Sequence, residues 1–257
     1  MAYPQIIEEF LELVSIPVFS FRERLLADAL MAKLRDLGMD FYEDDAAGKI
    51  GGDTGNIIAR LPGAPGLPAV LFSAHMDRVA NPGTIVPDVR ESEDRIVSGG
   101  DTILAADDVS GIVAILDGVR RAKASGKPCG DVECAFSVAE EVGLLGALHM
   151  DTSRFRAKTA YVLDVEGPLG TIVRGAPTQY TFKVKITGRA SHAGMAPEKG
   201  VNAINVGAQA LAGLREGRIS PVTTANFGVI CGGKATNIVC DLLVIEGEAR
   251  SHDEGEL

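Results

Sequence analysis

Apolar residues recur at helical spacing in two segments near the N-terminus. The segment Tyr3–Val14 carries such a stripe and predicts an amphipathic helix. A second helix is expected over Phe21–Leu37, because Gly38 directly after it is suited to end a helix. Pro17 lies between the two segments and indicates a break in the helical pattern.

Further along, short continuous apolar runs alternate with helical patterns. The runs that predict strands are Asn56–Leu61, Ala69–Ser73, Val132–Val138 and Ala160–Leu163. Helices are expected over Asp107–Ala124 and Val142–His149, and loops over Gly48–Gly55, Pro62–Pro68 and Asn81–Ser98. Strands that alternate with helices are typical of an α/β fold with a mostly parallel central sheet flanked by helices.

After Gly175 the pattern changes to alternation of polar and apolar residues. Gln179–Thr187 alternates in this way, as a half-exposed antiparallel strand does. A helix over residues 201–214 and strands over Asn226–Ile230 and Leu242–Ala249 follow. This β-α-β-β order is the first part of a ferredoxin-like α+β unit. We therefore expect two domains, a larger one over residues 1–175 and an incomplete lid domain over residues 176–257.

Composition narrows the class of protein. The formal net charge of −10, without a run of basic residues, argues against a nucleic-acid-binding surface. No apolar stretch is long enough to cross a bilayer, and the acidic N-terminus does not have the pattern of a signal peptide. The four cysteines form no C-x-x-C pair and are expected to be buried or half-buried thiols in a reducing compartment. We therefore expect a cytoplasmic protein without membrane contact.

Acidic and histidine side chains follow several of the predicted strands. They are His75, Asp77, Asp107, Asp108, Glu140, Glu141 and Asp164. The carboxyl ends of strands in an open α/β sheet face a shared crevice. Carboxylates gathered there repel one another unless a cation neutralises them, so the pattern predicts a site for divalent metal.

Each group also has a simpler interpretation. Asp107 and Asp108 could cap a helix, and the glutamate pair could complement the N-terminus of the next helix. Adjacent glutamates point in different directions, however, so one could bind metal while its neighbour acts as general base on the attacking water. Taken together, the four groups at strand ends favour a metallohydrolase over four separate coincidences.

In this order, the motifs SAHMD, LAADD, AEEVGLLGA, LD and SHAG resemble the co-catalytic zinc peptidases of clan MH. The group they most resemble is the peptidase T-like, glutamate carboxypeptidase-like and desuccinylase-like family with an inserted dimerisation domain. This resemblance implies cleavage of small peptides by a pair of Zn²⁺ ions, or of Co²⁺ or Mn²⁺, and a homodimer formed through the lid domain. Two alternatives stay open: a deacylase or carboxypeptidase for N-acyl amino acids, and an inactive fragment.

The same resemblance implies a role for each site residue. His75, Asp107 and Asp164 would bind one metal, with Asp107 bridging to a second metal held by Glu141. Glu140 would be the general base and Asp77 the acid that orients His75. From the second domain, His192 would stabilise the oxyanion, while Asn237 and Arg250 would contact substrate.

The chain departs from the family pattern at two points. Val109 stands where the family usually has a basic residue after the paired aspartates. The family's last metal ligand is a histidine in a C-terminal segment that returns to the first domain. None of His75, His149, His192 and His252 lies in such a segment. We therefore expect the chain to be a C-terminally truncated member of the family.

Overall fold

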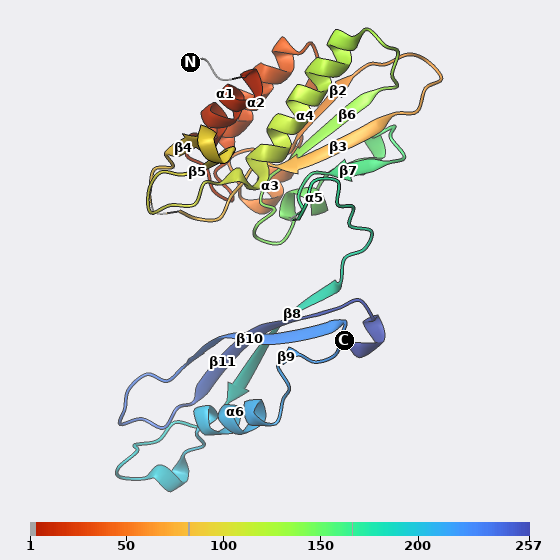
Figure 1. Cartoon of the computed structure of the whole chain (residues 1–257). Helices are drawn as coiled ribbons and strands as arrows, with labels where there is room; N and C mark the ends of the chain where they lie inside the picture. Colours follow the sequence, from red (N-terminus) through yellow and green to blue (C-terminus); the bar gives the residue numbers. More distant parts are fainter. Residues whose placement is uncertain (1–3, 82, 166) are drawn as a thin grey trace. The chain divides into compact units, whose positions relative to one another are not determined.

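The computed structural model describes residues 4–81, 83–165 and 167–257. Two compact units make up the chain, Met1–Leu169 and Gly170–Leu257, and each contains its own sheet (Figure 1). The helices of the first unit are α1 (Gln5–Val14), α2 (Arg24–Asp36), α3 (Ala46–Ile50), α4 (Ala106–Ser125) and α5 (Leu145–Leu148). Its strands are β1 (Asp40–Glu43), β2 (Ile57–Leu61), β3 (Val70–His75), β4 (Pro87–Arg90), β5 (Arg95–Ser98), β6 (Val132–Ser137) and β7 (Ala160–Val162).

The main sheet of the first unit has the strand order β1-β2-β6-β3-β7. Strand β3 runs parallel to both β6 and β7, whereas β1, β2 and β6 pair antiparallel. The α/β class is therefore confirmed, in the form of a mixed sheet whose parallel part is β6-β3-β7. Because these three strands run in the same direction, the residues that follow them come to one edge.

Helices α1, α2 and α4 lie together against the main sheet (Figure 1). Their apolar stripes supply most of the core, which explains the helical spacing seen in the sequence. The largest fully buried apolar side chains are Leu13, Val14, Leu26, Leu30, Leu34, Ile57, Met76, Ile112, Leu116, Phe136 and Val138. Val109, which follows the paired aspartates, is also buried in this core.

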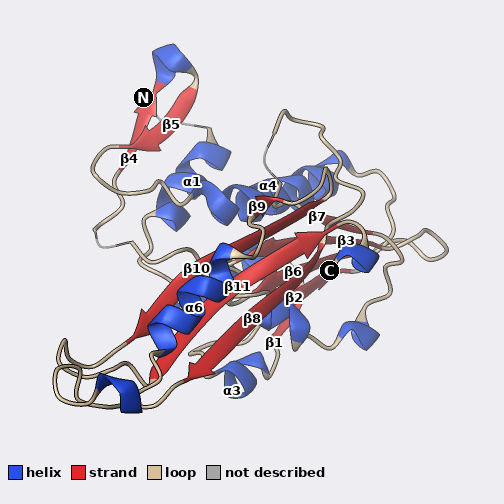
Figure 2. Ribbon diagram, turned by 90° about the horizontal axis from the view of Figure 1, so that it is seen from below, coloured by secondary structure: helices blue, strands red, loops and turns tan. Residues whose placement is uncertain are grey.

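The second unit is an antiparallel sheet with the order β8-β11-β10-β9 and one long helix, α6. Its elements are β8 (Thr178–Thr187), α6 (Ala203–Ala212), β9 (Gly217–Arg218), β10 (Thr223–Gly232) and β11 (Leu242–Ser251). Helix α6 lies against one face of the sheet (Figure 2), where Ala203 packs with Leu243 and Ile245. The observed β-α-β-β order agrees with the order expected from the sequence.

Three expectations from the sequence were wrong in detail. The segment Gly48–Gly55 was expected to be a loop, but it begins inside α3, and Asn81–Ser98 contains the β4-β5 hairpin. Both elements are short and half-exposed, so their apolar pattern is weak. Cys129 and Cys231 are exposed, not buried. Within the described residues, no helix is both long and apolar enough to span a membrane.

Candidate metal centre

The acidic and histidine residues expected at strand ends do lie at the carboxyl ends of the parallel strands. His75 is the last residue of β3, Glu140 and Glu141 follow β6, and Asp164 follows β7. Asp107 lies in the first turn of α4. The topology therefore gathers these five residues at one edge, although they are far apart in the sequence.

His75 is at the centre of this cluster and is almost completely buried. Its Nε2 atom lies 2.9 Å from Asp107 Oδ1 and 3.9 Å from Glu140 Oε2. Two sets of three residues bring ligand atoms within 4.8 Å of one another: His75, Asp107 and Glu141, and His75, Glu140 and Asp164. The structure thus places Asp107 and Asp164 in different sets, whereas the family resemblance implies that both bind one metal together with His75. Glu140, the expected base, lies in the same set as Asp164.

Asp77 connects His75 to the two glutamates. Its Oδ1 atom accepts a hydrogen bond from the backbone N–H of Glu140 at 2.8 Å, and its Oδ2 atom accepts one from Glu141 at 3.2 Å. Ser20 donates a third hydrogen bond to Oδ2, at 2.7 Å. On the other side, His75 Nδ1 lies 3.0 Å from the carbonyl oxygen of Asp77 and 3.4 Å from its Oδ1. One buried carboxylate therefore positions both the imidazole and the glutamate backbone.

The paired aspartates have different environments. The side chain of Asp107 is 68% exposed, whereas Asp108 is buried. Asp108 accepts hydrogen bonds from the backbone N–H of His75 at 3.2 Å and of Gly111 at 3.1 Å. The capping interpretation therefore applies to Asp108, which ties the start of α4 to the end of β3. Both residues have non-helical backbone angles, and the bond between them is cis.

Residues 138–141, here called the glutamate turn, are held by side chains along their whole length. Buried side-chain oxygens accept hydrogen bonds from all four consecutive backbone N–H groups. The pairs are Asn56 with Val138 at 3.1 Å, Glu23 with Ala139 at 3.0 Å, and Asp77 with Glu140 and Glu141. Neither Asn56 nor Glu23 was predicted from the sequence, because single polar residues near strand and helix starts are also ordinary capping residues.

The electrostatics of the cluster reflect burial and crowding. Burial, followed by the nearby charge of Asp164, raises the pKa of Glu140 above its usual range. Burial and then Asp107 raise the pKa of Glu141. Burial lowers the pKa of His75, but Asp77 and Asp107 more than offset this and raise it to about 10. His75, Glu140 and Glu141 therefore all hold a proton more strongly than these side chains do in water.

A divalent cation suits these donors. Imidazole nitrogen and carboxylate oxygen are ordinary ligands of Zn²⁺, Co²⁺ and Mn²⁺. A cation at this edge would relieve the repulsion that raises the pKa values of the two glutamates, and it would displace the proton on His75. The residues present therefore fit a metal centre.

Three further candidate residues lie in the second unit. The backbone N–H of Ala193, next to His192, donates to the carbonyl oxygen of Asn237 at 2.9 Å, so these two predicted residues are neighbours. His192 is exposed, and its Nδ1 atom accepts hydrogen bonds from Gly194 and Met195 at 3.2 Å. Arg250, on β11, donates to both carboxylate oxygens of Glu248, so its guanidinium is engaged within its own strand.

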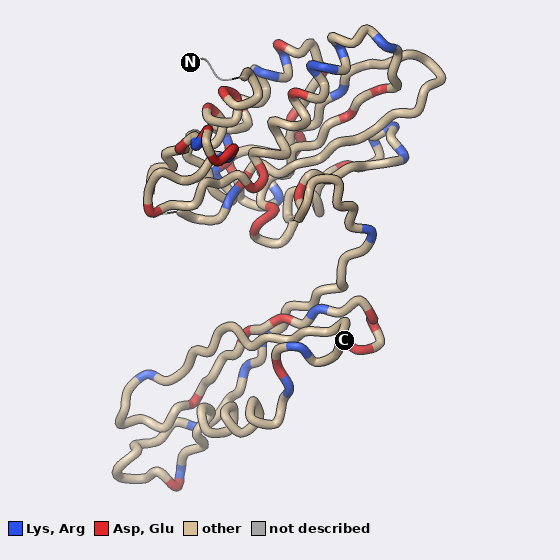
Figure 3. Tube along the Cα trace, viewed as in Figure 1, with Lys and Arg blue, Asp and Glu red and all other residues tan. Residues whose placement is uncertain are grey.

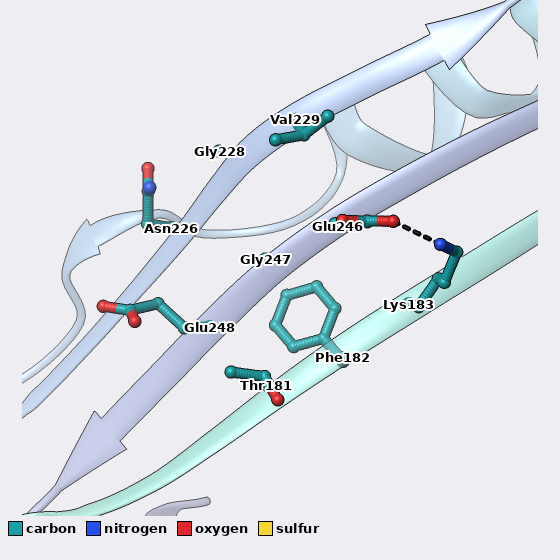
Figure 4. A pocket seen from close by; sticks show the side chains of 9 residues that line it. All are labelled: Thr181, Phe182, Lys183, Asn226, Gly228, Val229, Glu246, Gly247 and Glu248. Atoms are coloured by element: carbon teal, nitrogen blue, oxygen red, sulfur yellow. Dashed lines mark ion pairs between the residues drawn. The ribbon is translucent and has the colours of Figure 1, made fainter. Parts of the chain in front are cut away.

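A surface hollow of about 530 Å³ also lies in the second unit, on strands β8, β10 and β11. Figure 4 shows Phe182 beside Gly247 and an ion pair between Lys183 and Glu246. The hollow contains none of the predicted site residues. Acidic and basic positions are interspersed along both units (Figure 3), consistent with the absence of a basic run in the sequence.

Comparisons with known proteins identify the family of this chain. An aminopeptidase PepT from Bacillus cereus ATCC 10987 is 41% identical, with a TM-score of 0.85 over 98% of this chain and 67% of its own. The chain belongs to the peptidase T-like family of metallopeptidases. A tripeptidase from Staphylococcus aureus is 36% identical, with a TM-score of 0.91 and the same shares covered. Peptidase T of Vibrio cholerae is 30% identical over 73% of this chain and 52% of its own length.

Two family models match overlapping parts of this peptidase T-like chain. The model for peptidase family M28 matches residues 56–192, and the model for the peptidase dimerisation domain matches residues 177–257. The chain spans between about a quarter and two thirds of the length of the curated relatives it matches.

Proposed function

We propose that the protein is a metal-dependent peptidase that cleaves small peptides, in the manner of a tripeptide aminopeptidase. The convergence of His75, Asp107, Glu140, Glu141 and Asp164 at one sheet edge carries this proposal. Membership of the peptidase T-like family supports it. A Bacillus subtilis peptidase that shares the fold at 16% identity is described as binding a dinuclear metal centre. The alternative, an N-acyl amino acid deacylase or carboxypeptidase, is not better supported: a carboxypeptidase G2 of Pseudomonas sp. is 33% identical over 78% of this chain, below the identities of the two solved peptidase T-like structures.

His75, Asp107, Glu141 and Asp164 would hold the metal, with two Zn²⁺ as the proposed pair and Co²⁺ or Mn²⁺ as alternatives. When bound, such ions lower the pKa of water and polarise a carbonyl group. Glu140 takes the proton from the attacking water and later delivers it to the leaving amine. Burial raises the pKa of this carboxyl above its usual range.

Other residues of the chain orient the reactants. Asp77 fixes His75 and the backbone of Glu140 and Glu141, so the base and the ligands keep one geometry. We propose that His192 donates a hydrogen bond to the oxyanion. Asn237 and Arg250 are proposed to contact substrate, and Arg250 would have to exchange Glu248 for a substrate carboxylate. A homodimer through the second unit and a cytoplasmic location complete the proposal.

The test compares the chain with its Glu140→Gln variant, and each with a version extended through any downstream reading frame. Bound metal and hydrolysis of a tripeptide are measured with and without added Zn²⁺. We expect the variant to retain metal and to lose turnover by about 10²-fold or more, because the proton acceptor is gone. A variant that still cleaves peptides at the wild-type rate would show that Glu140 is not the base.

A further inference from the structure

Glu23 is a fully buried carboxylate that contacts the glutamate turn from outside the metal cluster. Its Oε1 atom accepts two hydrogen bonds, from the backbone N–H of Phe21 and from that of Ala139, each at 3.0 Å. Ala139 directly precedes the proposed base, Glu140. We propose that Glu23 is a positioning residue that holds the glutamate turn in its reactive geometry, an inference that rests on the proposed peptidase function.

Both backbone groups bound by Glu23 belong to residues in the left-handed region. Phe21 has a φ of 71° and Ala139 a φ of 50°, which residues with a side chain rarely adopt. Such conformations persist only where their surroundings hold them, and they concentrate at functional sites. A single oxygen of Glu23 holds both of them, so this side chain couples the approach to α2 with the approach to Glu140.

Helix capping does not account for Glu23. Although Glu23 is at the N-cap position of α2, its side chain makes no capping hydrogen bond. Asp53 caps the helix instead, since its Oδ1 atom accepts from the backbone N–H of Glu23 at 2.9 Å and of Arg24 at 3.1 Å. The side chain of Glu23 is therefore free to reach the glutamate turn.

Burial of this carboxylate is costly. Its Oε2 atom has no hydrogen-bond partner among the described residues, and burial raises the pKa of Glu23 to about 7. An apolar side chain would fill the same space without that cost. What an apolar side chain cannot supply is the acceptor for Ala139. Loss of this bond would loosen the glutamate turn between its anchors at Asn56 and Asp77, and small displacements of a reacting group cost large factors in rate.

Two conservative variants separate the effect of the length of the Glu23 side chain from the effect of its charge. Glu23→Gln keeps the length and an acceptor oxygen but removes the charge, whereas Glu23→Asp keeps the charge but is one methylene shorter. Glu9→Asp is the matched control, because Glu9 is also buried but pairs with Arg120 and Lys33 away from the site. Amide hydrogen exchange of residues 138–141, the visible spectrum of the Co²⁺-loaded protein, and kcat and KM for a tripeptide are measured for each.

If Glu23 positions the turn, Glu23→Asp exchanges the Ala139 amide about tenfold faster or more, alters the Co²⁺ spectrum and lowers kcat by about tenfold with little change in KM. Glu23→Gln and Glu9→Asp stay close to wild type in all three. The proposal is overturned if Glu23→Asp matches wild type in exchange and kcat, or if Glu23→Gln is impaired as much as Glu23→Asp. Should the wild type cleave no peptide, the exchange and spectral results still decide the positioning role, and only the proposed function fails.

Discussion

Glu23 also makes the stability of the fold depend on pH. Its folded pKa of about 7 lies above the ordinary value of 4.5, because burial disfavours the charged form. The stabilising effect of its bound proton is therefore complete below pH 4.5 and is lost as the pH rises through about 7. Glu23→Gln is neutral at every pH. Its free energy of unfolding should exceed that of wild type by on the order of 2 kcal/mol at pH 8, and by much less at about pH 4.

Urea unfolding of the metal-free protein at both pH values measures this difference. Comparing variant with wild type cancels the other carboxyl groups, including Asp77, whose pKa shifts in the opposite direction. A stability difference that is the same at both pH values would mean that Glu23 keeps an ordinary pKa in the folded chain.

Arg78 is a second buried charged residue near the site, and most of its hydrogen-bonding nitrogens are left without a partner in the part of the chain that the structure describes. Its Nη1 atom donates to the carbonyl oxygen of Val14 at 2.9 Å, but Nε and Nη2 have no partner among the described residues. Burial lowers the pKa of Arg78 to about 10. Arg78→Met should leave the free energy of unfolding unchanged or raise it by about 1 kcal/mol, because an apolar side chain of similar size avoids the desolvation cost.

Thermal unfolding of Arg78→Met, beside Arg90→Met at an exposed position, checks this expectation. A loss of about 3 kcal/mol or more would instead indicate that the guanidinium compensates another buried group.

At the scale of elements, the junction between β3 and α4 depends on a glycine. A side chain at Gly111 would bring its Cβ within 2.2 Å of Asp108 Oδ1 and 2.8 Å of the carbonyl oxygen of Leu163. Gly111→Ala should therefore displace Asp108 from the backbone of His75, destabilise the fold by about 1–3 kcal/mol and weaken metal binding.

The matched control lies in the same helix. A Cβ at Gly118 meets no atom within 4 Å, so Gly118→Ala should stabilise α4 by about 0.5–1 kcal/mol. Calorimetry of metal binding and urea unfolding distinguish the two variants. Equal effects at both positions would contradict the role assigned to the junction.

The sequence predicted the long elements and the site better than the short elements, for physical reasons. Helix α4 buries one apolar stripe, so its helical period is visible in the sequence, and β3 is a continuous apolar run that ends at His75 as the site requires. The half-exposed strand β1 was missed because its four residues show no strong alternation. The hydrogen bonds from Ala139 to Glu23 and from Val138 to Asn56 were also missed, since they join residues about a hundred positions apart and follow from the fold alone.

At the scale of the whole molecule, the connection between the two units is expected to be the first point of proteolysis. Residues 171–177 lie in neither a helix nor a strand, and Ile172 and Val173 are 80% and 62% exposed. Each flanking unit has its own buried core, so each should remain folded after a cut. Brief trypsin treatment should therefore cleave after Arg174 and give two resistant fragments, one that ends at Arg174 and one that begins at Gly175.

Mass spectrometry of the earliest products identifies the cut. Arg174→Gln should delay the division of the chain, whereas Arg95→Gln, in the exposed β4-β5 hairpin, should not. Protection of Arg174 together with an early cut at Arg95 would mean that residues 171–177 are held more firmly than the hairpin. In that case the two units do not behave as separately folded bodies, and the proposed division into a metal-binding domain and a dimerisation domain would need a different boundary.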